Sequence, residues 1–168
     1  MALKKTSEVV SISFSLDETA ANTFTEQRID LQLSPLDQEV FVVLAASLDP
    51  FYPDALAATD TRVNASLSTT SKTGVVNLSD PQCIATAANA IQAAGFVDGG
   101  VSFQTVPLET PQGETDYIHI ISTNDFFVQC AGVGNSVAKG VDGRLWGYRA
   151  RADAATYAAL VNSEVLSS

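Results

Sequence analysis

Residues 10–16 read Val-Ser-Ile-Ser-Phe-Ser-Leu, so that apolar side chains alternate strictly with serines. Successive side chains of a β-strand point to opposite faces, and this alternation therefore predicts a strand with one buried face. The same period of two returns farther along the chain, in Arg28–Leu33 and Arg62–Thr69. The residues expected to face inward are Val10, Ile12, Phe14, Leu16, Ile29, Leu31, Leu33, Val63, Ala65 and Leu67.

The remaining apolar segments extend this pattern to about nine short strands. Glu39–Leu48 loses the alternation in its middle, as expected of a central strand that is covered on both faces. The other expected strands are Val75–Val76, Val101–Leu108, Tyr117–Ser122, Phe126–Cys130 and Arg144–Arg151. Short strands separated by turn signals favour an antiparallel β-sandwich or barrel. We expect residues 1–168 to form a single β-rich domain without linkers or repeats.

Two short helices are expected to interrupt the strands. Asp80-Pro81 combines an N-cap residue with proline at the first helical position, which predicts a helix over about 80–95. Asp153 is a second cap, and the apolar residues that follow it at helical spacing predict a helix over 153–166.

The composition limits the functional class. The chain has 168 residues, of which 46% are hydrophobic and only 17% are charged, and its mean hydropathy is +0.14. There is enough apolar material for a core, so these values exclude a disordered chain. The net charge is -10, which argues against direct nucleic-acid binding because phosphates repel a net anion. A surface with few charges favours large buried contacts between subunits.

The negative charge is unevenly distributed along the chain. The net charge is -7 in residues 1–60, -3 in residues 61–120 and zero in residues 121–168. Three of the nine basic residues fall between Arg144 and Arg151, a distribution that suits a basic strand meeting an acidic region of a neighbouring subunit. Pairing within the chain would satisfy the same charges.

The strand that contains these arginines also supplies aromatic residues. Trp146, Tyr148 and Ala150 are expected on one face, with Leu145, Arg149 and Arg151 on the other. Tryptophan, tyrosine and arginine are enriched at interface hot spots. The structural alternative is that the aromatic residues pack in the core while the arginines are solvated. The residues that we predict as interface candidates are Trp146, Tyr148, Arg144, Arg149, Arg151, Phe51 and Tyr52.

No motif for catalysis, a cofactor or a metal is found, and none is predicted. His119 is the single histidine, and we expect it to be a strand-surface or partly buried residue. Cys83 and Cys130 lack metal-type spacing and are expected to be reduced and buried, with a long-range disulfide as the alternative. Asp49, Asp54 and Asp60 could bind Ca²⁺, but they do not follow the EF-hand order and are expected to be solvated loop acids.

The sequence does not match the pattern of a signal peptide or of a membrane span. The start of the chain contains Lys4 and Lys5, but the alternating segment that follows is unlike the continuous apolar core of a signal peptide. No segment approaches the length of a membrane span. We therefore expect synthesis in a cytoplasm without a signal peptide.

Two segments carry a resemblance to virion structural proteins. They are Arg28-Ile-Asp-Leu-Gln-Leu-Ser-Pro-Leu-Asp-Gln-Glu-Val-Phe-Val-Val-Leu44, and Leu145-Trp-Gly-Tyr-Arg-Ala-Arg151 with its following helix. With about nine strands in one domain of this size, the chain resembles the single jelly-roll coat proteins of icosahedral viruses. The resemblance implies a jelly-roll-like fold, a location in the virion, and partners that are copies of the chain or other virion proteins. Many coat proteins carry a basic arm, whereas only Lys4 and Lys5 stand here, so genome binding through the N-terminus is not implied.

Three functional hypotheses follow. The first is a non-enzymatic, self-assembling structural protein, such as a viral capsid or other virion component that forms a protein shell from homo-oligomeric contacts. The second is a β-sandwich binding module for carbohydrate or a receptor, for example on a phage fibre. The third is an enzyme that uses dispersed carboxylates, which would need two carboxyl groups about 5–10 Å apart in one pocket.

Overall fold

Ten strands and one helix make up the regular structure of the residues that the computed structural model describes, which are 3–97, 99–105 and 117–167. The mainly β fold expected from the sequence is confirmed. In chain order the elements are β1 Leu3–Lys5, β2 Val10–Asp17, β3 Thr25–Asp30, β4 Glu39–Pro50, β5 Thr61–Ser68, β6 Cys83–Gln92, β7 Val101–Thr105, β8 His119–Ile121, β9 Asp125–Val133, β10 Gly140–Ala152 and α1 Ala154–Ser167.

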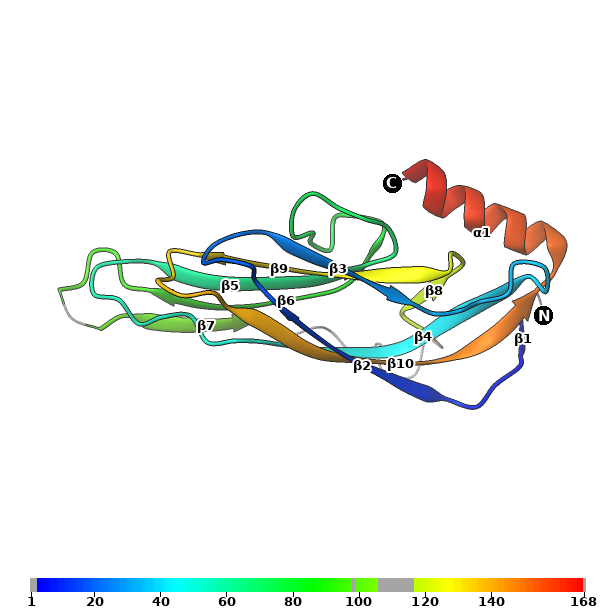
Figure 1. Ribbon diagram of the computed structural model, residues 1–168, viewed down its shortest axis with the longest axis horizontal. Helices are drawn as coiled ribbons and strands as arrows, with labels where there is room; N and C mark the ends of the chain where they lie inside the picture. The colour runs from blue at the N-terminus through cyan, green and yellow to red at the C-terminus, as the bar shows by residue number, and fades with distance from the viewer. Residues whose placement is uncertain (1–2, 98, 106–116, 168) are drawn as a thin grey trace.

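The strands form two antiparallel sheets, and the strand pairs enclose one another in chain order. In sheet A, β10 lies between β4 and the two strands β1 and β2, and β8 lies outside β4. In sheet B the order is β3-β9-β5-β6-β7. Moving outward from the β5–β6 pair, β4 pairs with β8, β3 with β9 and β2 with β10, so that each pair encloses the previous one. Eight strands nested across two sheets have the connectivity of a jelly roll, and Figure 1 shows the elongated sandwich that they form.

The core lies between the two sheets, and β4 shows why its sequence loses alternation. Phe41 and Val43 pack into the core between the sheets, whereas Val40 and Val42 belong to a second cluster on the outer face of sheet A. All four side chains are at most 1% exposed. Burial of each contributes about 2 kcal/mol, so both faces of this strand stabilise the fold. The prediction of a central strand covered on both faces is confirmed.

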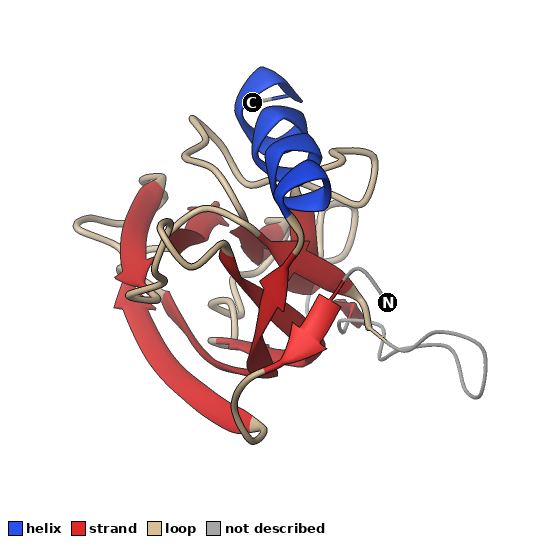
Figure 2. Cartoon of the chain, turned by 90° about the vertical axis from the view of Figure 1, so that its right-hand side faces the viewer, coloured by secondary structure: helices blue, strands red, loops and turns tan. Residues whose placement is uncertain are grey.

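The helix α1 covers the second cluster. Asp153 accepts a hydrogen bond from the backbone N–H of Thr156 at 2.7 Å, which confirms the predicted cap. Tyr157 and Leu160 then pack against the outer apolar cluster of sheet A. Figure 2 looks along the sandwich and shows the helix lying above the strands. The one helix that the structure describes lacks the length and apolar character needed to cross a membrane.

The helix predicted over about 80–95 is wrong, because residues 83–92 form the strand β6. Asp80 and Pro81 instead begin a turn, in which the backbone N–H of Cys83 bonds to the Asp80 carbonyl and that of Gln82 bonds to the Asp80 carboxylate. Aspartate and proline favour the first two positions of such turns as strongly as they favour a helix start. Pairing with β5 and β7 on both sides then overrides the helix propensity of the alanines.

The other strand predictions differ mainly at their bounds. The structure assigns no strand to Val75–Val76, and β1 was not predicted. β3 begins and ends three residues earlier than expected, yet Leu31 and Leu33 are buried as predicted. The predicted strand Val101–Leu108 is described as β7 to Thr105, and its last three residues lie outside the described part of the chain.

Candidate interaction surfaces

The seven interface candidates lie in two regions of the molecule. Arg144, Trp146, Tyr148, Arg149 and Arg151 belong to β10 in sheet A, whereas Phe51 and Tyr52 follow directly after β4. Because β10 lies inside sheet A, its backbone is paired on both sides. Any contact through these β10 residues with another molecule must therefore use side chains.

Trp146 and Arg144 lie on the open outer face of sheet A. The Arg144 guanidinium is 6.0 Å from the centre of the Trp146 ring, and its Nε donates to the hydroxyl of Ser13 at 3.1 Å. With Asp49 and Asp142 they border a shallow hollow of about 310 Å³. Asp49 and Asp142 are directly opposite in the β4–β10 register, so this face carries a like-charged cross-strand pair.

Tyr148 lies farther along the same face, where other parts of the chain cover it. Its ring is half-buried in the cluster beneath α1, and the ammonium group of Lys5 is 5.1 Å from the ring centre. A cation at this distance over an aromatic face is attracted by the ring quadrupole. Tyr148 therefore helps to fasten β1 and α1 to sheet A.

Arg149 and Arg151 both have acidic partners in the same chain. Arg149 donates to Glu39 Oε1 at 2.8 Å and to the carbonyl oxygens of Leu31 and Gln32 at 2.6 and 3.0 Å. This arginine thereby connects β10 of sheet A to the segment that follows β3 of sheet B. Arg151 is 3.5 Å from Asp37 in an exposed ion pair. Both arginines thus follow the alternative given in the sequence analysis, in which basic residues of this strand pair with acids of the same chain.

The second region, which we call the apolar end, surrounds β7. It consists of exposed side chains on the segment after β4, on the β6–β7 turn and on β7 itself: Tyr52, Leu56, Phe96, Val97, Val101 and Phe103. Tyr52 is 83% exposed and Phe103 is 54% exposed. Phe51, the neighbour of Tyr52, is also exposed. Large apolar side chains gathered in this way mark a binding surface more often than a free one.

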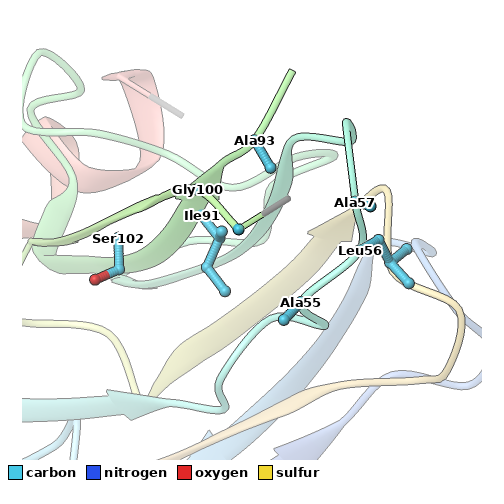
Figure 3. A pocket seen from close by; sticks show the side chains of 8 residues that line it. Ala55, Leu56, Ala57, Ile91, Ala93, Gly100 and Ser102 are labelled. Atoms are coloured by element: carbon cyan, nitrogen blue, oxygen red, sulfur yellow. The ribbon is translucent and has the colours of Figure 1, made fainter. Parts of the chain in front are cut away.

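Two hollows open at the apolar end. The larger has a volume of about 380 Å³ (Figure 3). It is lined by Ala55–Ala57, Ile91, Ala93, Gly99, Gly100 and Ser102. The second, of about 270 Å³, is lined by Tyr52, Phe103, Asn89 and Gln104 among others. Both hollows share Ile91 and Ser102, so they are adjacent.

Most of the apolar end was not predicted from the sequence. Tyr52 was identified, but Leu56, Val101 and Phe103 were not. A signal was present, since residues 81–108 contain a single charged residue, Asp98. The sequence analysis predicts a helix and a strand in this segment and does not use its low charge.

The two cysteines and the single histidine are each buried or partly buried. Cys83 and Cys130 are free thiols, and burial raises their pKa to about 11 and about 12, so both stay protonated near neutral pH. Cys130 is buried as expected, whereas Cys83 is only partly buried. His119 is half-buried beside α1, and burial lowers its pKa.

Of the three acids expected in a loop, Asp49 lies in β4, and Asp54 and Asp60 lie in the segment that follows it. Asp54 pairs with Lys139 at 2.7 Å and accepts from the N–H and hydroxyl of Ser136, and these bonds, that of Lys139 first, hold its pKa well below the ordinary value. Asp60 accepts from the backbone N–H groups of Ala93 and Ala94. Within residues 3–97, 99–105 and 117–167, no three acidic, histidine or cysteine residues gather in a way that could hold a metal ion.

Comparison with known proteins gives little further identification. No protein-family model matches the sequence, and no curated protein matches it. One solved structure, titled Desmodium yellow mottle tymovirus, is similar over 84% of this chain and 87% of its own chain, with 11% identity and a TM-score of 0.26. A TM-score this low does not establish a relationship.

Proposed function

We propose that this chain is a self-assembling structural protein, a subunit of a closed protein shell such as a viral capsid. The observation that carries the proposal is the apolar end, where Tyr52, Val97 and Phe103 are 83%, 88% and 54% exposed. Covering apolar surface contributes about 25 cal/mol per Å², so these side chains favour association with another molecule. The partners are copies of the same chain.

A shell subunit needs contacts on more than one side, and the sandwich offers them. The connection between β3 and β4 lies at the opposite end of the long axis from the β6–β7 turn (Figure 1), and its residue Leu36 is 97% exposed. A subunit with a separate contact at each end can bind a different neighbour at each, as an extended shell requires. The jelly-roll connectivity supports the same function, because this architecture recurs in capsid subunits, although it also serves lectins and cupins.

The test is to measure the size of the purified protein as a function of concentration. We expect sedimentation velocity to show large oligomers, and electron micrographs to show particles of uniform size. A single monomeric species at every accessible concentration and ionic strength would overturn the proposal.

A pair of matched variants locates the contact. Val97→Ser removes an exposed apolar side chain from the apolar end, and Leu78→Ser removes one that is 66% exposed in the loop between β5 and β6. We expect Val97→Ser to weaken assembly and Leu78→Ser to leave it unchanged, with equal thermal stability for both. Equal assembly by both variants would count against the apolar end.

The response to salt separates two kinds of contact. Apolar contacts persist or strengthen as salt is added, whereas a contact between a basic strand and an acidic neighbour weakens. Because Arg149 and Arg151 are paired within the chain, we expect association to persist at high salt. Loss of the oligomer at high salt would favour the charged contact through β10.

A carbohydrate-binding module is the second candidate, and one observation favours it. Tyr52 borders a hollow that is also lined by Gln104, whose side chain is exposed. An exposed aromatic ring near an exposed amide side chain suits a sugar, which has apolar and hydroxyl-bearing faces. Glycan screening with Tyr52→Ala as the control tests this function, and the absence of any binding by the original chain would exclude it.

A further inference from the structure

The strand β7 is an edge of sheet B, and no strand within residues 3–97, 99–105 and 117–167 pairs with its outer side. All of its residues, Val101–Thr105, are exposed, and β6 is the one described segment to which its backbone is paired. Its outer N–H and C=O groups therefore face outward, where they can pair with another strand. The five residues include no charge and no proline, which are the usual means of preventing such pairing.

The surroundings of β7 also lack charge. Residues 81–108 contain one charged residue in 28, whereas the whole chain has 28 in 168. Two copies of a chain with a net charge of -10 repel each other wherever their acidic surfaces approach. This segment is where two copies can approach with the least repulsion.

We propose that β7 pairs with β7 of a second copy across a two-fold axis. This inference rests on the proposed function, since it assigns one contact of the assembly. The two strands run antiparallel, and the axis passes beside Phe103, the middle residue, so that all five residues have partners. Val101 of each copy then lies opposite Thr105 of the other, and the two five-stranded B sheets join into one continuous sheet of ten.

Symmetry is the reason for choosing a second copy rather than another protein. A two-fold contact uses the same patch twice, so the patch must be complementary to itself. An uncharged strand with similar residues at both ends satisfies this condition without any opposite charge on the partner. Phe103 meets its own copy at the axis, and the apolar hollows beside the strand give the arriving aromatic rings space to pack.

A charge swap tests both the strand and its register. In the variant Val101→Lys/Thr105→Lys, two lysines face two lysines across the axis, and we expect the contact to weaken about tenfold or more. In Val101→Lys/Thr105→Glu, each lysine faces a glutamate of the other copy, and we expect association to recover. All these positions are exposed, so the subunit fold is not affected. Equal association by the two double variants would overturn the proposal.

A crosslink provides a second measurement that does not depend on affinity. Phe103→Cys, placed in a Cys83→Ser background, brings two cysteines together at the axis, within the 4.4–6.8 Å between Cα atoms that a disulfide spans. The matched control is Gln27→Cys on β3, the opposite edge of sheet B, where Gln27 is exposed. We expect mild oxidation to give a covalent dimer of the first variant only. Equal crosslinking of both variants, or none of the first, would contradict the pairing.

The outcomes distinguish this inference from the proposed function. If the unmodified chain is monomeric at all concentrations, both are wrong. If it assembles while the charge-swap pair and the crosslink show no dependence on β7, the proposed function stands and the β7 contact is wrong.

Discussion

The two edges of sheet B contrast with each other. β3 carries Glu26, Arg28 and Asp30, whereas β7 at the opposite edge carries no charge at all. An exposed strand edge invites unwanted pairing, and charged side chains are a common means of blocking it. One edge of this sheet carries charges and the other carries none, and this contrast is the basis for the contact that we propose at β7.

Side-chain bonds secure β3 and the segment before it. Two residues before the strand, the buried carboxylate of Glu18 accepts from the backbone N–H of Thr23 at 2.9 Å. Within the strand, Glu26 accepts from the Lys72 backbone at 2.8 Å and so holds the β5–β6 loop against the sheet. Near its end, Arg28 pairs with Asp125 at 2.5 Å. No described side chain forms a comparable bond to β7.

The largest expected effect is at the start of β3. Glu18 also accepts from the N–H groups of Gly132 and Lys139, so Glu18→Ala leaves three backbone donors without this acceptor, and that of Gly132 is buried. We expect the free energy of unfolding to fall by roughly 3 kcal/mol or more, measured by urea denaturation. The control Glu8→Ala, at an exposed position, is expected to change it by less than about 0.5 kcal/mol. A similar effect of both substitutions would show that β3 is not secured by Glu18.

A smaller loss is expected from a substitution within β3, at its second residue Glu26. Glu26→Ala removes the acceptor of the Lys72 backbone and one partner of the fully buried Gln129 amide. We expect a loss of about 2 kcal/mol in the same denaturation experiment. Gln104→Ala on β7 is expected to cost less than about 0.5 kcal/mol, because that side chain forms no described bond. Equal costs at the two edges would remove the contrast between them.

Hydrogen exchange compares the edges without any substitution. In dilute protein we expect the amides of β7 to exchange faster than those of β3, because β3 is held by side-chain bonds and β7 is not. On raising the concentration, protection is expected to increase in β7 and to stay constant in β3. An increase confined to β3 would reverse the assignment of the open edge.

The smallest effect is a pH dependence in the segment that borders the hollow beside β7. Asp54 has a pKa held below its ordinary value by Lys139 and Ser136. Its stabilisation is therefore complete above the pKa of an unfolded aspartate, about 4, and is lost as the pH falls toward the lower folded value. We expect protease cleavage within residues 51–60 to increase below about pH 4. The variant Asp54→Asn is expected to be cleaved readily at all pH values. Cleavage that is independent of pH in the original chain would contradict this role.

The sequence predicted those strands whose burial follows a simple period. Alternation identified β2 and β5, and the loss of alternation identified β4 as buried on both faces. The strand β6 was missed, because Asp80-Pro81 begins a turn as readily as a helix and because pairing on two sides outweighs alanine's helix propensity.

The candidate surfaces were predictable only in part. Trp146 and the arginines are distinctive within one segment, so sequence reasoning finds them easily. The partners of Arg149, by contrast, come from residues more than a hundred positions away in the chain. The apolar end brings together three separate segments, and its exposure depends on which strand occupies the edge of sheet B. No local pattern contains that information.

The central place of β10 in sheet A has a consequence for synthesis of the protein. This strand pairs with β1, β2 and β4, yet it follows all the other described strands in the chain. The strands β1 and β2 must therefore wait for β10 while more than a hundred residues are added. Sheet B can pair earlier, since all of its strands precede β10. Completion of sheet A is thus postponed until β10 has been synthesised, and we expect slow, non-local folding in which a nascent chain exposes β7 before it has a complete sandwich.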